Sequence, residues 1–191
     1  MDYIVRKALD SDNHNIARTL VYSFEKDLAS FTKDMEGIVK VFENGIETNR
    51  FFVAEQNDEM IGAIACADHT GRAFNVNKND CTKHFGAIQG RIAYNIIVRE
   101  FLSPLTYPAT TGNIDVVGVL PKARGKGVAK VLLKTIIDNN PQYCEFTLEA
   151  DSANTSALKC YIDFGFVEFS RAPIMKSSKR SRVFMKYSVQ A

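Results

Sequence analysis

Hydrophobic residues recur along this chain with two periods that predict different secondary structures. Spacings of three or four residues indicate helices in the segments at about 12–24, 35–44, 82–102, 126–139 and 154–164. Short apolar or alternating runs between turn residues indicate strands at 3–8, 51–54, 60–67, 114–120, 145–150, 166–170 and 183–189. The second half reads strand–helix–strand–helix, which favours parallel strands, whereas a short turn near residue 57 favours an antiparallel pair. We therefore expect an α/β fold with a mixed sheet.

One stretch, at about 70–112, interrupts this order of elements. Its apolar residues fall at helical spacing and predict one helix over about 82–102: Phe85, Ile88, Ile92, Ile96 and Ile97. The chain has 191 residues and shows neither an internal repeat nor a low-complexity linker. We therefore expect a single domain over residues 1–191, with a helical insertion at about 70–112.

Composition narrows the class of protein without naming a function. Hydrophobic residues make up 46% of the chain and charged residues 24%, as in an ordinary soluble globular domain. The chain has 24 Lys and Arg residues against 22 Asp and Glu residues, for a formal net charge of +2. Neither nucleic acid nor a membrane is therefore expected as a partner. No signal-peptide pattern and no apolar stretch long enough to span a membrane is found in the sequence.

The cysteines and histidines predict neither disulfides nor a metal site. The four cysteines are widely spaced without a C-x-x-C pair: Cys66, Cys81, Cys144 and Cys160. The three histidines show no ligand spacing with one another. We expect four reduced thiols in a cytoplasmic protein that binds no metal.

The most informative segment, residues 116–137, joins an apolar strand to an amphipathic helix through the basic loop RGKG at 124–127. Helix N-termini present unpaired N–H groups and a partial positive charge, and glycine lets a phosphate approach the backbone closely. The segment therefore predicts a phosphate or pyrophosphate site. It is not a P-loop, because G-x-x-x-x-G-K-[ST] is absent. Lys130 stands where a dinucleotide-binding G-x-G-x-x-G motif needs its third glycine, so the segment is a poor match to that motif as well.

Two motifs in the second half carry a family resemblance. The loop matches R-x-x-G-x-A after a strand, at Arg124, Gly127 and Ala129. A later helix matches N-x-x-A-x-x-x-Y-x-x-x-G-F, at Asn154, Ala157, Tyr161, Gly165 and Phe166. Over residues 113–170 the chain resembles the GNAT superfamily of acetyl-CoA-dependent N-acetyltransferases. The resemblance implies the acyl-CoA N-acyltransferase fold, in which a mostly antiparallel central sheet has a parallel, splayed strand pair and helices on both faces.

The resemblance implies acetyl-CoA as a cosubstrate, without a metal. By position, main-chain groups of Val117 and Val119 would bind the pantetheine arm between the splayed strands. Asn154, which is also a natural N-cap, would touch the same arm. N–H groups of the loop and first helical turn would wrap the pyrophosphate: those of Arg124, Gly125, Lys126, Gly127, Val128 and Ala129. The two valines are also compatible with an ordinary core position, because the implied contact is through the main chain.

The resemblance also implies a reaction, the direct attack of an amine on acetyl-CoA in a ternary complex. Tyr161 would lie near the thioester sulfur and donate a proton or hydrogen bond to the departing thiolate. An alkylammonium with a pKa of about 10 must lose a proton, and Glu149 matches the base of some relatives; Asp115 and a water chain are the alternatives. A salt-bridge role for Glu149 and a packing role for Tyr161 stay open. For Cys160 we expect a buried thiol rather than a covalent acyl intermediate.

The implied function is transfer of an acetyl group from acetyl-CoA to a primary amine on a small molecule or a peptide. Acidic residues around the second helical segment would suit a cationic acceptor: Asp27, Asp34, Glu36, Glu43 and Glu47. The insertion helix would pack on the sheet, cap the acceptor site or form the face of a homodimer. The basic run at 176–182 is expected to be the solvated turn of the last hairpin. The alternative function is a non-catalytic acyl-CoA-binding sensor or interaction domain on the same fold.

Overall fold

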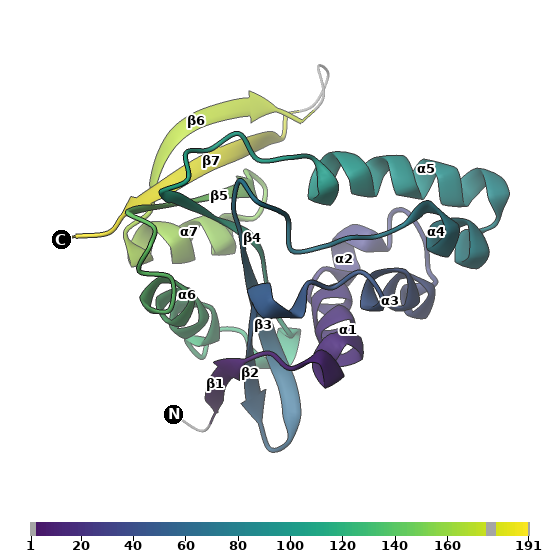
Figure 1. Cartoon of the computed structure of the whole chain (residues 1–191), viewed down its shortest axis with the longest axis horizontal. Helices are drawn as coiled ribbons and strands as arrows, with labels where there is room; N and C mark the ends of the chain where they lie inside the picture. The colour runs from purple at the N-terminus through teal and green to yellow at the C-terminus, as the bar shows by residue number, and fades with distance from the viewer. Residues whose placement is uncertain (1–2, 175–178, 191) are drawn as a thin grey trace.

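The computed structural model describes residues 3–174 and 179–190, which form a seven-stranded sheet with helices on both faces (Figure 1). The strands are β1 Ile4–Lys7, β2 Phe51–Gln56, β3 Glu59–Ala67, β4 Thr111–Val119, β5 Glu145–Asp151, β6 Val167–Pro173 and β7 Ser181–Ser188. Their order is β1-β2-β3-β4-β5-β7-β6, and each neighbouring pair is antiparallel except β4–β5. The predicted α/β class, with a mostly antiparallel sheet and one parallel pair, is confirmed.

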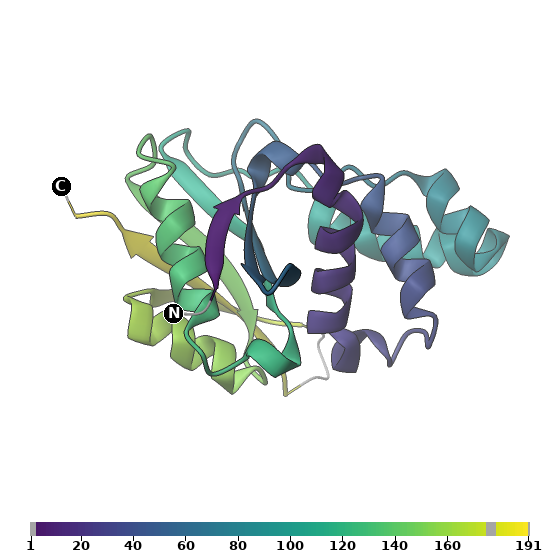
Figure 2. The ribbon, with the colours of Figure 1, turned by 90° about the horizontal axis from the view of Figure 1, so that it is seen from below.

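Helical layers cover the two faces of the sheet (Figure 2). The α-helices of the described residues are α1 Asn13–Ser23, α2 Glu25–Leu28, α3 Met35–Glu43, α4 Lys78–Phe85, α5 Ala87–Ile97, α6 Val128–Asp138 and α7 Thr155–Phe164. The shorter turns are η1 Asp10–Asp12, η2 Thr48–Arg50, the π-helical η3 Val98–Leu102 and η4 Pro121–Ala123. Helices α1 and α3 pack on one face of the sheet, and α6 and α7 pack on the other.

Alternating side chains of the strands supply both layers of the core. In β2, Phe51 and Val53 join the cluster formed with α1 and α3, whereas Phe52 and Ala54 join the cluster formed with α6 and α7. Burying one large apolar side chain contributes roughly 1.5–3 kcal/mol. Because β2 is buried on both faces, it appears in the sequence as a continuous apolar run rather than an alternating one.

The parallel pair β4–β5 is short. The two strands pair over four residues, from Thr111 opposite Glu145 to Ile114 opposite Leu148. Beyond this point both strands continue, but β4 is then bonded to β3 and β5 to β7. The facing edges of β4 and β5 are therefore unpaired in the sheet past Ile114, which matches the splayed geometry that the resemblance implied.

A β-bulge in β4 coincides with the end of this pairing. Ala65 of β3 lies opposite Val116, and Cys66 lies opposite Ile114. Asp115 is thus the extra residue, because it falls between two consecutive pairs of the ladder. A bulge bends its strand and increases the local twist, so it helps β4 to diverge from β5 at this position.

The insertion contains two helices where the sequence predicted one, so that prediction was wrong. Gly86, with φ 78° and ψ 169°, takes the chain out of the helical region between α4 and α5. The two helices pack closely, because a Cβ on Gly90 would lie 2.5 Å from the Cys81 carbonyl oxygen. The predicted apolar stripe is divided accordingly. Ile88 and Ile92 are 78% and 57% exposed, while the last turn of α5 joins the core.

The closing hairpin is present as the antiparallel pair β6–β7. The predicted basic turn at 176–182 lies partly outside the described residues, which omit 175–178. Within the described part, Arg182 departs from the prediction of a solvated turn. It belongs to β7, and its side chain is 34% exposed and forms ion pairs with Glu100 and Glu149.

Candidate active site

A cavity of about 480 Å³ lies where β4 and β5 diverge. The sheet contributes residues 113–115 of β4, 149–151 of β5 and Arg182 of β7 to its lining. The insertion supplies the facing wall, from residues between 99 and 107. The structure therefore brings Glu149 and Asp115, the two carboxylates considered as the base, to one cavity, and it places the carboxyl-terminal part of the insertion over them.

Val117 and Val119 occupy the part of β4 beyond its pairing with β5. Both are half-buried, and both pair with β3, opposite Ile64 and Gly62. Their side chains contact the core cluster that includes α6 and α7. The two valine side chains thus occupy core positions, as the sequence also allowed. The edge of β4 that faces β5 is where the predicted main-chain contact to pantetheine would form.

The glycine loop has the geometry of an anion site at the start of α6. Gly125 and Gly127 have φ of 74° and 80°, a region that favours glycine. Gly127 is the N-cap of α6 and provides no side-chain cap. The bond from the Val131 N–H to the Gly127 carbonyl oxygen, at 3.1 Å, joins the loop to the helix. The N–H groups of residues 128–130 precede the helix's own ladder and are available to an anion.

The Arg124 side chain binds main-chain carbonyl oxygens of the protein itself, whereas a basic loop would be expected to point its charges at a phosphate. Its Nη2 donates to the Ser23 carbonyl oxygen at 2.6 Å, and its Nε donates to the Val119 carbonyl oxygen at 3.1 Å. The side chain therefore caps the carboxyl end of α1 and ties the loop to the end of β4. Lys126 is exposed in the loop and keeps its charge near the N-terminus of α6. Pyrophosphate binding by this loop stays a prediction.

The second motif places Asn154 and Tyr161 on α7. The Asn154 side chain accepts a hydrogen bond from the Ala157 N–H at 3.1 Å, so its role as an N-cap is confirmed. Tyr161 is buried, with its ring 6.1 Å from that of Phe166 in an edge-to-face arrangement. Burial raises the pKa of Tyr161 well above its usual range. The phenol therefore stays protonated at neutral pH, which is the state a hydrogen-bond donor needs.

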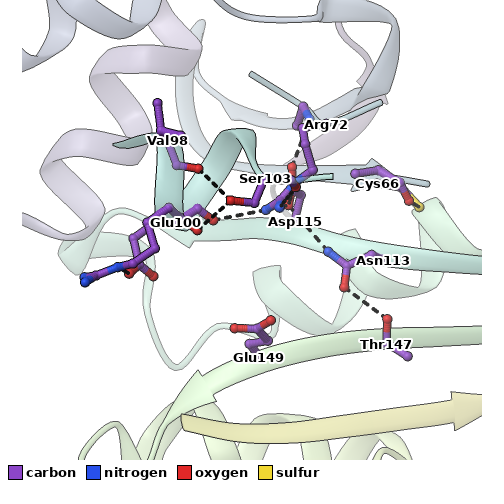
Figure 3. A network of polar contacts seen from close by, with 12 residues as sticks. Cys66, Arg72, Val98, Glu100, Ser103, Asn113, Asp115, Thr147 and Glu149 are labelled. Carbon is purple, nitrogen blue, oxygen red and sulfur yellow. Dashed lines mark hydrogen bonds and ion pairs between the residues drawn. The ribbon is translucent and has the colours of Figure 1, made fainter. Parts of the chain in front are cut away.

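Asp115 is fully enclosed by donors (Figure 3). Its Oδ1 accepts from Arg72 Nε and Nη2 at 2.9 and 2.5 Å, and its Oδ2 accepts from the Ala73 N–H at 2.9 Å. Asn113 Nδ2 adds a longer contact at 3.4 Å, and Asn113 in turn accepts from the Thr147 hydroxyl. The Asp115 side chain has no exposed surface. A carboxylate so occupied holds the insertion to β4 and is poorly placed to accept a proton from a substrate.

Glu149 is more accessible than Asp115. Its side chain is 40% exposed, and its Oε2 lies 3.0 Å from Nη1 of Arg182. Figure 3 shows the Glu149 side chain between the ribbons of β4 and β5. Glu149 thus forms the salt bridge that the sequence analysis left open, and its side chain also lines the cavity.

A comparison with protein families shows which family the chain belongs to. The sequence model of the acetyltransferase (GNAT) family matches residues 18–166. The chain belongs to this family. A search of curated proteins found no match.

Solved structures share the GNAT fold with this protein at low sequence identity. An N-acetyltransferase from Staphylococcus aureus Mu50 has a TM-score of 0.63 and 19% identity, with 96% of this chain and 100% of that chain covered. The protein yncA from Salmonella typhimurium, with its cofactor acetyl-CoA, has a TM-score of 0.60 and 16% identity, with 100% and 95% covered. A chain of the NatC complex bound to Gag peptide and CoA has a TM-score of 0.60 and 18% identity, with both chains fully covered.

Four residues that shape the cavity of this GNAT protein lie outside both motifs and were missed: Arg72, Glu100, Tyr107 and Arg182. Arg72 and Arg182 are ion-paired there, and burial raises the pKa of Tyr107. Arg72, Glu100 and Tyr107 belong to the insertion, for which the resemblance provides no positions. Arg182 stood in the basic run just before the predicted strand at 183–189, and no sequence signal pointed to its contact with Glu149.

The remaining reactive groups do not form a second site. The four cysteines are free, and burial raises the pKa of Cys66 to about 12 and also raises that of Cys160. Cys160 is half-buried rather than buried as expected, and its raised pKa disfavours the nucleophilic thiolate that a covalent intermediate would need. Within the described ranges, no group of three or more His, Cys, Asp or Glu residues could hold a metal ion. No helix in that part of the chain is long and apolar enough to span a membrane.

Proposed function

We propose that this GNAT protein transfers the acetyl group of acetyl-CoA to a primary amine by direct attack in a ternary complex. The observation that carries the proposal is the diverging pair β4–β5, which has a glycine-capped helix N-terminus on one side and a cavity with Glu149 on the other. The acetyl-CoA and CoA named with yncA and the NatC complex support acetyl-CoA as the cosubstrate.

In this proposal the cosubstrate is bound mainly by main-chain groups. Val117 and Val119 offer the free edge of β4 to the pantetheine arm, and Asn154 flanks the same arm. The pyrophosphate takes the N–H groups from Arg124 to Ala129, where Gly125 and Gly127 remove steric obstruction. No metal is needed, because the helix N-terminus and Lys126 supply positive charge at the phosphates.

The chemistry assigns one proton transfer to each end of the reaction. Glu149 accepts a proton from the acceptor ammonium, so that the amine nitrogen has a lone pair to attack the thioester carbonyl carbon. The new C–N bond forms as the C–S bond breaks, and the attacking nitrogen then releases its second proton, which replaces through water the one that Tyr161 gives up. Tyr161, which is protonated at neutral pH, donates to the departing sulfur. The enclosed state of Asp115 favours Glu149 over Asp115 as the base.

The acceptor in this proposal is a small molecule or a peptide with a primary amine, and the Gag peptide named with the NatC complex supports the peptide case. The cavity carries both acidic and basic side chains, which suits neither a nucleic acid nor a membrane surface. The four free cysteines support a cytoplasmic protein. A homodimer through the exposed stripe of α5 stays a hypothesis.

The test is acetyl-CoA binding followed by transfer. We expect a thermal shift with millimolar acetyl-CoA, and release of free CoA thiol with at least one amine of a broad panel. Tyr161→Phe should slow transfer by about 100-fold or more with little change in acetyl-CoA affinity, because only a hydroxyl in the reaction path is removed. The absence of any thermal shift would refute acetyl-CoA binding. Binding without transfer to any amine would favour the sensor or interaction domain.

A further inference from the structure

Two arginines in different surroundings join the insertion to the sheet at the cavity. Arg72 is 13% exposed and pairs with the fully buried Asp115. It also donates to the carbonyl oxygens of Ser103 and Glu100, at 2.8 and 3.1 Å. Arg182 is 34% exposed and lies on β7. The first arginine fixes the end of η3 rigidly on β4, whereas the second is held in water-accessible space.

Arg182 bridges two carboxylates that come from separate parts of the chain. Its Nη2 donates to Glu100 Oε2 at 2.6 Å, and its Nη1 lies 3.0 Å from Glu149 Oε2. In the β5–β7 ladder Arg182 is opposite Asp151, and Glu149 is opposite Phe184. Arg182 and Glu149 are thus diagonal neighbours on one face of the sheet, a spacing that long side chains can span.

We propose that Arg182 is a positioning residue for Glu149, and that Glu100 of the insertion sets how strongly Arg182 holds it. The proposal rests on the proposed function, in which Glu149 is the base. At Glu149, the negative charge of Glu100 partly offsets the positive charge of the guanidinium that both carboxylates contact. The insertion thereby acts on the reacting carboxylate through the charge of Glu100.

The geometry gives the two Glu149 oxygens different tasks. Arg182 engages Oε2, and no hydrogen bond to Oε1 is found among the described residues. In the reaction, an N–H bond of the acceptor ammonium breaks and an O–H bond forms at Oε1. Arg182 keeps the carboxylate oriented during this step, because its ion pair with Oε2 is on the other oxygen. The guanidinium thus places a positive charge at Glu149 Oε2, and Glu100 places a negative charge against the same guanidinium.

Other charged or titratable side chains line the same cavity and contribute to the electrostatic environment of Glu149: Arg72, Arg99, Tyr107, Asp115 and Asp151. Four of them are already paired: Arg72 holds Asp115, Asp151 forms an ion pair with Arg180, and Arg99 pairs with Glu100. Arg99 pairs with the Oε1 of Glu100 and is 73% exposed. Arg182 is thus the guanidinium in direct contact with Glu149 in the described part of the cavity.

The test compares the pH dependence of kcat/KM for Arg182→Gln and Glu100→Gln. Arg182→Gln removes the positive charge, so the acid limb should move to higher pH by about one unit. Glu100→Gln keeps a hydrogen-bond acceptor for Arg182 but removes the competing negative charge. Its acid limb should move by a smaller amount in the opposite direction, to lower pH. Arg182→Lys should restore a limb close to that of the wild type.

A matched control is Arg171→Gln on the neighbouring strand β6. Arg171 pairs with Glu168 on its own strand, outside the cavity, so its loss should leave the pH profile unchanged. A carbon-13 NMR titration of the Glu149 carboxyl group in the free protein should follow the same order as the kinetic limbs. Shifts of Arg182→Gln and Glu100→Gln in the same direction, or no shift in either, would overturn the proposal.

The failure of this proposal and the failure of the proposed function give different results. A wild-type protein that binds acetyl-CoA but acetylates no amine refutes the transferase, and with it any role for Arg182 in catalysis. An active wild-type protein whose acid limb and NMR titration are unmoved by Arg182→Gln refutes the positioning role alone. Acetyl-CoA affinity should change little in these variants, because the contacts proposed for the cosubstrate come from main-chain groups and Asn154, which the substitutions leave in place.

Discussion

The two ends of the site are built by different means. The end at the loop depends on the main chain, since Gly125 and Gly127 take positive φ before an α6 N-terminus that has no side-chain cap. The end at the insertion depends on side chains that lie far apart in the sequence. Arg72 and Asp115 are separated by 43 positions, and Arg182 and Glu100 by 82. The backbone end of the site follows from the local sequence. The ion-paired end exists only once the fold brings distant segments together.

The largest effect should come from Arg72→Ala at the insertion end. The buried Asp115 carboxylate would lose its counter-ion, and two carbonyl oxygens of the insertion would lose their donor. Removal of one partner of a buried pair costs about 3–5 kcal/mol of the free energy of unfolding, which urea denaturation measures.

A double variant separates buried charge from lost packing. Arg72→Met combined with Asp115→Asn removes both charges, so it should be more stable than Arg72→Ala alone. A loss below about 1 kcal/mol for Arg72→Ala would contradict the view that this end is fixed by a buried ion pair.

A smaller loss is expected for Asp68→Asn, where the chain leaves β3 for the insertion. Burial acts to raise the pKa of Asp68, but hydrogen bonds from Thr70 and Tyr143 and the charge of Arg50 outweigh it and lower the pKa. At pH 7 the variant should lose about 1–3 kcal/mol of unfolding free energy.

The pH dependence of that loss follows from the lowered pKa. A carboxylate with a depressed folded pKa stabilises the protein above its unfolded pKa of about 3.9, and this stabilisation is lost as pH falls through the folded value. The difference between wild type and Asp68→Asn should therefore be largest near neutral pH and shrink below about pH 4. A difference that is constant from pH 7 to pH 2.5 would argue against an ionised Asp68.

At the loop end, Gly127→Ala should cost about 1–2 kcal/mol of stability, because alanine is strained at φ 80°. It should also weaken acetyl-CoA binding, measured by calorimetry, since the loop backbone would shift. Gly86→Ala is the matched control, because Gly86 also has positive φ and its added Cβ would meet no atom within 4 Å. The control should lose stability and keep its acetyl-CoA affinity. Equal losses of affinity in both variants would remove the distinction between the two ends.

The smallest effect is a gain from Tyr3→Phe beneath the loop. The Tyr3 hydroxyl is buried without a hydrogen-bond partner among the described residues, and it lies 3.9 Å from the position of a Cβ on Gly127. Removing it should raise the free energy of unfolding by about 1 kcal/mol. Acetyl-CoA affinity should stay the same. A lower melting temperature would show that the hydroxyl has a partner.

Sequence reasoning performed well where structure depends on neighbours along the chain. The helix predicted at about 126–139 is α6, Val128–Asp138, and Asn154 is the N-cap that its residue type favours. It failed at the insertion, where spacing alone predicted one helix and Gly86 separates two. Apolar periodicity does not register a single change of backbone conformation, because the stripe continues on both sides of it.

The sequence by itself determined the order of elements, the α/β class, the glycine loop and the two motifs that mark a GNAT protein. Each of these depends on residues that are near one another along the chain, where the sequence spacing fixes their relative positions in space. Only the tertiary structure decided that Asp115 is enclosed, that Glu149 is accessible, and that Arg182 joins Glu149 to the insertion. These facts depend on ion pairs across distant segments, and charge has no periodicity that could have revealed its partner in advance.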